Sequence, residues 1–220
     1  MAEIAPGLWR WTGLHPDWTP GEGGTAGWDA EVGCVYLETP DAVVLVDPLV
    51  PPEEPERFWR ALERDVARVA APVHAVVTIF WHARSAGEIA RRLSARVWAP
   101  ARARRPVERR AGVAVETFRP GERLPGGIEA YSTSRSTEVV LWIPEHRALV
   151  PGDVILGTQE GGLRLGPESW LPAGGGHAAL RASLAPLLAL PVERVLVSHG
   201  EPVLEGAGEA LRLALGRPPR

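Results

Sequence analysis

Two successive blocks of this sequence each place β-like runs before helical patterns, and this order constrains the fold more than any other feature. No linker or composition break separates the blocks, so residues 1–220 are predicted to form a single domain. Two sheets packed together with helices outside, an α/β architecture, would bury both sets of apolar faces. The expected strands are residues 8–12, 32–37, 42–47, 73–79, 97–98, 113–118, 128–133, 138–143, 148–150 and 192–197. The expected helices begin near residues 52, 85, 180 and 205.

Composition limits which binding partners and which cellular compartment are expected for this chain. The net charge of -3 offers no strong attraction for nucleic acid or anionic lipid, and the basic run 102–110 is expected to be a solvated surface. A single cysteine, Cys34, excludes an intramolecular disulfide. No signal peptide and no apolar run of about 18 residues is present, which predicts a soluble cytoplasmic protein without nucleic-acid or membrane partners. All basic residues are Arg, which fits a thermostable protein and a GC-rich genome equally well.

Four apolar runs end in residues that could build or support a metal site. They are residues 43–48 (VVLVDP), 76–87 (VVTIFWHARSAG), 149–154 (LVPGDV) and 195–200 (VLVSHG). In order and spacing they resemble the metallo-β-lactamase superfamily. This resemblance implies a four-layer αββα sandwich and a cleft that holds two zinc ions and hydrolyses ester, thioester or lactam-like bonds.

The second run departs from the family pattern. The resemblance places Ile79, Trp81, Ala83 and Arg84 at ligand positions, and none of these side chains is a usual zinc donor. The best match to another histidine-bearing turn, residues 134–136 (SRS), also lacks its histidine. The chain therefore resembles a divergent member with a degenerate motif, in which Asp153 and His199 remain from the usual ligand set.

Loss of the dinuclear centre suggests a protein that binds a small ligand, anionic or neutral, in the former cleft without zinc and without zinc-dependent hydrolysis. A buried Asp153 would then need a partner, and either Arg84 or Arg135 is expected to replace the metal as an internal cation. Trp81 is expected to fill the vacated volume. The predicted cleft residues are Trp81, His82, Arg84, Arg135, Asp153 and His199.

Two alternatives stay open, so the sequence leaves undecided whether the protein is an enzyme. In the first, the protein is a hydrolase whose metal site has fewer ligands than usual, with one zinc ion held by His82, Asp153 and His199. Against it, neighbours on an extended segment face opposite ways, which would point His82 out of the cleft. In the second, the protein is a structural subunit. His15 is a further candidate because its loop could lean over the cleft. Ligand identity and oligomeric state are not determined.

Overall fold

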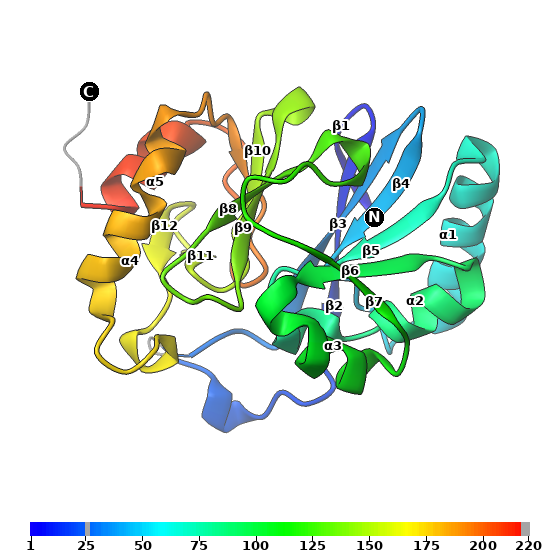
Figure 1. Ribbon diagram of the computed structural model, residues 1–220, viewed down its shortest axis with the longest axis horizontal. Helices are drawn as coiled ribbons and strands as arrows, with labels where there is room; N and C mark the ends of the chain where they lie inside the picture. The colour runs from blue at the N-terminus through cyan, green and yellow to red at the C-terminus, as the bar shows by residue number, and fades with distance from the viewer. Residues whose placement is uncertain (25–26, 217–220) are drawn as a thin grey trace.

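The strands of the protein form two main sheets that pack face to face (Figure 1). The computed structural model describes residues 1–24 and 27–216. The first sheet runs in chain order, antiparallel from β1 to β4 and parallel from β4 to β7. Its strands are β1 (Ala2–Ala5), β2 (Leu8–Leu14), β3 (Glu31–Thr39), β4 (Ala42–Val46), β5 (Val73–Val76), β6 (Arg96–Pro100) and β7 (Val115–Phe118).

The second sheet has the strand order β13-β10-β9-β8, and a small antiparallel ribbon, β11 with β12, lies on the same side of the molecule (Figure 1). Strand β13 pairs in parallel with β10 and forms one edge of the second sheet. These strands are β8 (Glu129–Ser132), β9 (Val139–Ile143), β10 (Ala148–Val150), β11 (Ile155–Gly157), β12 (Leu163–Leu165) and β13 (Arg194–Val195).

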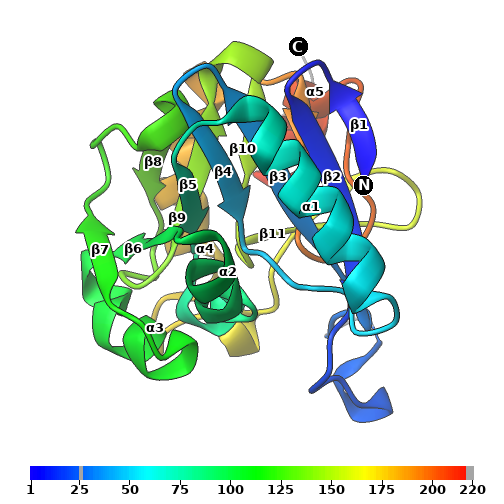
Figure 2. The same ribbon diagram turned by 90° about the vertical axis from the view of Figure 1, so that its right-hand side faces the viewer.

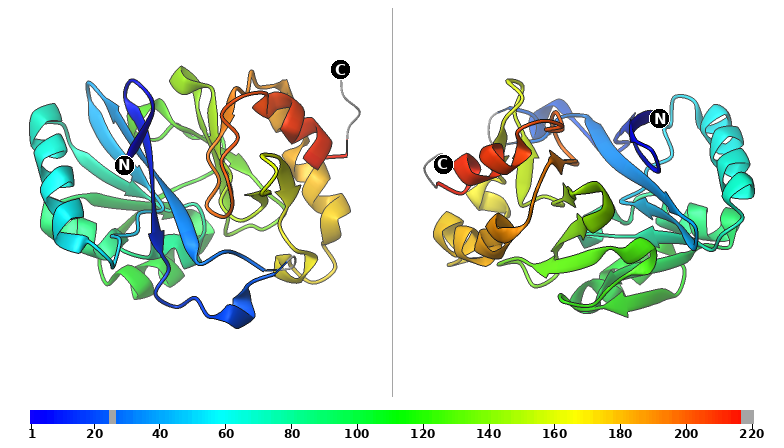
Figure 3. Two further views of the ribbon diagram at one scale, coloured as in Figure 1. Left: turned by 180° about the vertical axis from the view of Figure 1, so that it is seen from behind. Right: turned by 90° about the horizontal axis from the view of Figure 1, so that it is seen from above.

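Helices cover the outer face of each sheet, which gives four layers (Figures 1 and 2). The helices that precede β8 lie on the first sheet and those that follow β12 lie on the second. The view from behind shows the two halves side by side (Figure 3). One apolar cluster fills the space between the sheets, and another fills each sheet-to-helix space. The helices are α1 (Pro55–Val69), α2 (Ala86–Leu93), α3 (Arg104–Ala111), α4 (Gly176–Leu184) and α5 (Ala207–Ala214).

The predicted α/β sandwich is confirmed. Strands β1, β11 and β12 were not predicted, and three predicted segments differ from the structure. The strand expected at 73–79 ends at Val76, and a short 3₁₀ helix, Phe80–Ala83, begins soon after it. The basic run expected to be only a solvated surface forms most of α3, whose Val107 and Ala111 are buried against the first sheet. The strand expected at 192–197 contributes only β13 to the ladder. Among the described residues, no helix is both long enough and apolar enough to cross a membrane.

Candidate functional site

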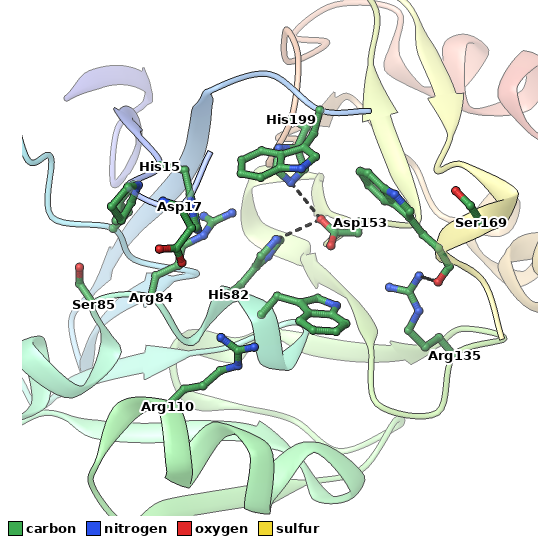
Figure 4. A pocket seen from close by; sticks show the side chains of 15 residues that line it. His15, Asp17, His82, Arg84, Ser85, Arg110, Arg135, Asp153, Ser169 and His199 are labelled. Atoms are coloured by element: carbon green, nitrogen blue, oxygen red, sulfur yellow. Dashed lines mark hydrogen bonds and ion pairs between the residues drawn. The ribbon is translucent and has the colours of Figure 1, made fainter. Parts of the chain in front are cut away.

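A cavity of about 710 Å³ opens along one edge of the sandwich, where loops from both halves of the chain meet (Figure 4). The first sheet supplies the loop after β2, the segment after β5 and the end of α3. The second sheet supplies the loops before β9, after β10 and after β13. The side chains used below are His15, Asp17, Trp28, Trp81, His82, Arg84, Arg110, Arg135, Asp153, Trp170 and His199.

Asp47 organises the floor of this cavity from behind. It follows β4, is buried, and has a left-handed backbone with φ of 50°. One carboxylate oxygen accepts the backbone N–H of Thr78 at 2.8 Å, and the other accepts the Thr78 hydroxyl at 2.6 Å. That second oxygen also lies 2.8 Å from Nδ1 of His82. The carboxylate, and not a strand of the first sheet, takes the Thr78 N–H, whereas the Thr78 carbonyl oxygen accepts the backbone N–H of Val139 from the second sheet.

The three residues of the candidate metal site are His82, Asp153 and His199, and all three are buried. Oδ1 of Asp153 lies 3.0 Å from Nε2 of His82 and 3.2 Å from Nε2 of His199. Within the described part of the chain this oxygen has no partner of hydrogen-bond geometry, so the three atoms converge without being joined by well-aligned bonds. Figure 4 shows the two imidazoles approaching Asp153 from different elements.

Burial and charge act in opposite directions on the pKa values of this cluster. Burial and the nearby Arg84 lower the pKa of His82, but the Asp153 and Asp47 carboxylates outweigh them and raise it to about 9. Burial lowers the pKa of His199 below its ordinary value, despite its contact with Asp153. The two imidazoles hold the pKa of Asp153 well below its usual range, against the effect of burial. Without a metal, His82 is therefore the cation of the cluster and His199 is neutral.

A second buried ion pair supports Asp153 from the other side. Oε1 of Glu138 accepts the backbone N–H of Asp153 at 2.6 Å, and Oε2 lies 2.8 Å from Nη1 of Arg135. The Arg135 guanidinium also donates to the carbonyl oxygen of Trp170. Burial and the Asp153 charge raise the pKa of Glu138 to about 8, although Arg135 opposes this. The pair fixes the loop that carries Asp153.

Comparisons of the fold identify its class. No family model matches the sequence, and no curated protein sequence matches it significantly. Solved structures do match in fold. A metallo-beta-lactamase from Pontibacter korlensis is 17% identical, with a TM-score of 0.68 over 99% of this chain and 98% of that one. The chain has the metallo-β-lactamase fold.

Two further solved structures are similar to this chain over most of its length. The metallo-beta-lactamase FIM-1 from Pseudomonas aeruginosa, in its mono-zinc form, is 16% identical, with a TM-score of 0.67 over 98% of this chain and 93% of that one. A metallo-beta-lactamase family protein from Thermus thermophilus is 17% identical, with a TM-score of 0.63 over 97% of this chain and 80% of that one. These likenesses confirm the fold predicted from the four sequence landmarks.

The donor set in this metallo-β-lactamase fold fits one metal ion. One donor atom from each of His82, Asp153 and His199 lies within 4.8 Å of the others, and the short contacts of 3.0 and 3.2 Å approach the roughly 3.4 Å edge of a tetrahedral zinc site. The Asp47 carboxylate on Nδ1 leaves Nε2 of His82 facing the cluster, as outer carboxylates do for metal-bound imidazoles. No second cluster of three such donors occurs among the described residues.

All six predicted cleft residues line the cavity, but the expected arginine pairs with Asp153 are wrong. Arg84 turns away from Asp153: its guanidinium donates to the Ser198 hydroxyl at 2.8 Å and to the carbonyl oxygen of Asp47 at 3.1 Å. Arg135 pairs with Glu138 instead. The carboxylate finds its partners in the two imidazoles, which lie closer to it.

The argument against His82 as a ligand and the expected burial of Trp81 are also wrong. The argument that His82 would face away assumed an extended segment, but residues 80–83 form a 3₁₀ helix, in which successive side chains do not alternate. His82 consequently points at Asp153. Trp81 does not fill a vacated interior, because it is 49% exposed at the cavity rim.

Sequence reasoning named His15 as a further candidate, and His15 does line the cavity, but it missed Trp28, Glu138 and Arg110. Trp28 packs edge-to-face on His199 with ring centroids 5.1 Å apart, and His15 packs on Trp28 in the same way. Burial and the charge of Arg84 lower the pKa of His15 to about 4, so it is neutral at pH 7. Glu138 could have been suspected, because a lone acid directly precedes the apolar run of β9. Arg110 was hidden within the basic run.

Proposed function

We propose that the protein is a hydrolase of ester, thioester or lactam-like bonds that works with a single metal ion held by His82, Asp153 and His199. The observation that carries this proposal is the convergence of three buried donor atoms at the floor of the cavity, where Oδ1 of Asp153 lacks a hydrogen bond within the described chain. One of the structures with the same fold is a mono-zinc form, which supports a one-ion arrangement. When bound, the ion would act as a Lewis acid that lowers the pKa of a water molecule.

The protein's own residues prepare the site for such an ion. Asp47 sets the tautomer and orientation of His82, and Glu138 fixes the backbone of Asp153. Trp28 packs against His199 in a T-shaped arrangement, and burial lowers the pKa of His199, which favours the neutral imidazole that a metal ligand needs. Cavity size suits a small molecule, since ligand pockets usually enclose about 300–1,000 Å³.

A specific observation favours a second candidate, a metal-free binding protein. His82 already contacts a carboxylate with each ring nitrogen, Asp47 at 2.8 Å and Asp153 at 3.0 Å. Its raised pKa makes it an internal cation that balances Asp153 without any metal. In this case the cavity would bind a small ligand and catalyse no hydrolysis.

Metal content separates the two candidates. The protein would be purified without a metal-affinity step, dialysed with zinc and then against metal-free buffer, and measured by elemental mass spectrometry. We expect a single equivalent of zinc, lost in His82→Ala and retained in the matched control His177→Ala. His177 lies near the start of α4 and contacts the Gly166 carbonyl oxygen, outside the cluster. Zinc below a tenth of an equivalent, taken as roughly background, would refute the metal site and leave the second candidate.

Activity is tested on the zinc-loaded protein with nitrophenyl acetate, phenyl thioacetate and a chromogenic cephalosporin. Turnover of at least one probe, abolished by His82→Ala and by chelation but not by His177→Ala, is the expected result. Full zinc occupancy with no turnover of any probe would refute the hydrolase proposal while leaving the metal site in place.

A further inference from the structure

Three arginines line the cavity, and two of them are already engaged by the protein. Arg84 donates to a hydroxyl and to backbone carbonyl oxygens, and Arg135 is bound to Glu138 and to a backbone carbonyl oxygen. Their charges hold the loops of the site together. Neither guanidinium can turn toward a ligand without breaking buried contacts.

Arg110 differs from both, because its charge has no partner among the residues that the structure describes. It lies at the end of α3, and no hydrogen bond or ion pair of its side chain is found within residues 1–24 and 27–216. The guanidinium instead lies over two aromatic rings, 5.6 Å from the centroid of Phe80 and 5.5 Å from that of Trp81. This position holds the cation at the cavity wall, and Figure 4 shows its guanidinium end directed toward His82.

Trp81 supplies an apolar surface beside this cation. It is 49% exposed, and its ring stacks on that of Phe80 with centroids 3.8 Å apart. An exposed tryptophan next to an unpaired arginine offers a flat face and a charge to the same ligand. The pair forms one wall of the cavity.

The carboxylates of the cavity do not neutralise Arg110. Asp153 contacts the two imidazoles, and Asp17 lies beside His15 on the opposite wall (Figure 4). Neither forms an ion pair with Arg110 in the described chain. A ligand that brings its own negative charge would therefore complete this wall.

We propose that Arg110 and Trp81 bind an oxyanion-bearing small molecule, so that the substrate class is an acyl compound carrying a carboxylate or phosphate group. Arg110 would bind the anionic end in fork geometry, and Trp81 would contact the adjoining apolar part. The labile bond would then lie toward the donor cluster. The reaction in this statement depends on the proposed hydrolase function, whereas the binding does not.

Binding is tested first, by isothermal titration calorimetry with benzoate, phenyl phosphate and neutral benzyl alcohol. The variants are Arg110→Gln and the matched control Arg109→Gln, which removes an exposed charge from the neighbouring position of α3, outside the cavity lining. We expect Arg110→Gln to weaken binding of the preferred anion about tenfold and Arg109→Gln to change it by less than about twofold. Binding of benzyl alcohol should be unchanged by both variants. Benzoate and phenyl phosphate together show which oxyanion fits.

Three results would overturn the proposal. The first is equal binding of benzoate, phenyl phosphate and benzyl alcohol, or no binding of either anion. The second is an equal loss in both arginine variants, which would mean diffuse attraction to a basic surface. The third is anion binding that requires added zinc and is unaffected by Arg110→Gln, because the anion would then bind the metal.

The kinetic arm separates this proposal from the hydrolase proposal. Zinc-loaded protein is assayed with mono-nitrophenyl succinate and with nitrophenyl butyrate, which differ in one terminal carboxylate. We expect the succinate ester to have the higher kcat/KM, and Arg110→Gln to remove that preference mainly through KM. Anion binding through Arg110 with no turnover of either ester would refute the hydrolase and support the anion site. Turnover of both esters with equal kcat/KM would support the hydrolase and refute the anion site.

Discussion

The buried pair of Arg135 and Glu138 allows a quantitative test of how the Asp153 loop is held. Their side chains are 11% and 0% exposed and 2.8 Å apart, and Glu138 also accepts the Asp153 N–H. Arg135→Met keeps most of the side-chain length but removes the charge and its donors. Above pH 8, where Glu138 is ionised, the change leaves a carboxylate buried without its cation, and this arrangement is far more destabilising than loss of an exposed pair.

The expected loss follows from burial and pH. Breaking a buried ion pair by removing one partner costs about 3–5 kcal/mol, and Glu138 can limit this loss by binding a proton. Its pKa is already raised to about 8, so the folded protein holds a proton there that the unfolded chain releases near pH 4.5. The contribution of Glu138 to the free energy of unfolding is therefore complete below pH 4.5, and it is lost as pH rises through 8. Arg135→Met should therefore cost more at pH 9 than at pH 6. A loss of about 3 kcal/mol would lower Tm by roughly 6–12 °C in a chain of this size.

Urea unfolding of the wild type, Arg135→Met, Glu138→Gln and the double variant measures the coupling at both pH values. We expect a coupling free energy of about 2 kcal/mol or more at pH 9. Arg147→Met is the matched control, because Arg147 and Glu193 form a pair at 2.6 Å with side chains 55% and 48% exposed. That change should cost less than about 1 kcal/mol. Additive single variants, or an Arg135→Met protein as stable as the control, would refute the account of the loop.

Two further predictions concern protonation and packing near the site. In metal-free protein, His82 has a pKa of about 9, above its ordinary 6.5, so its stabilisation is complete below pH 6.5 and lost as pH rises through 9. His82 should account for about 2 kcal/mol of the stability lost between pH 7 and 9, so His82→Gln should flatten this slope in urea titrations; equal slopes would contradict it. A Cβ at Gly87 would lie 1.9 Å from the Ala111 carbonyl oxygen, so Gly87→Ala should displace α3 at a cost of about 1–3 kcal/mol. Calorimetry should show a lower Tm than in Gly21→Ala, where the nearest atom is 3.8 Å away, and an unchanged Tm would refute the close packing.

Layer order could be read from the sequence because each layer leaves its own apolar pattern. The run 42–46 is continuously apolar and buried on both faces, as expected for a strand between two layers. The C-terminal end of β5 could not be predicted in this way. Residues 77–79 are as apolar as the strand, but Asp47, thirty-one positions before Thr78, takes its N–H, and Ile79 bridges to Glu138 instead of continuing β5. A contact between distant residues decides that boundary.

Helix α3 shows a signal that was present but obscured. Ala103, Val107 and Ala111 recur at every fourth position and are all buried, which is the spacing of one helical face. The many arginines between them indicated a solvated run, and both descriptions are correct for different faces of the helix. Arg110 reaches the cavity because it lies next to the buried face, at the end nearest the 3₁₀ helix.

The donor cluster could not be derived from a ligand pattern, because it depends on Asp47. When this sequence is compared position by position with the metallo-β-lactamase motif, only two ligands remain, which indicates that the site is lost. In the fold, Asp47 binds both ends of a short turn, through Thr78 and Nδ1 of His82, and this turn replaces the extended segment assumed from sequence. Nε2 of His82 is thereby left facing Asp153. The Asp47 carboxylate behind the loop thus orients His82 as a donor, although the motif places His82 out of register. Asp47→Ala should therefore abolish zinc binding as completely as His82→Ala is expected to.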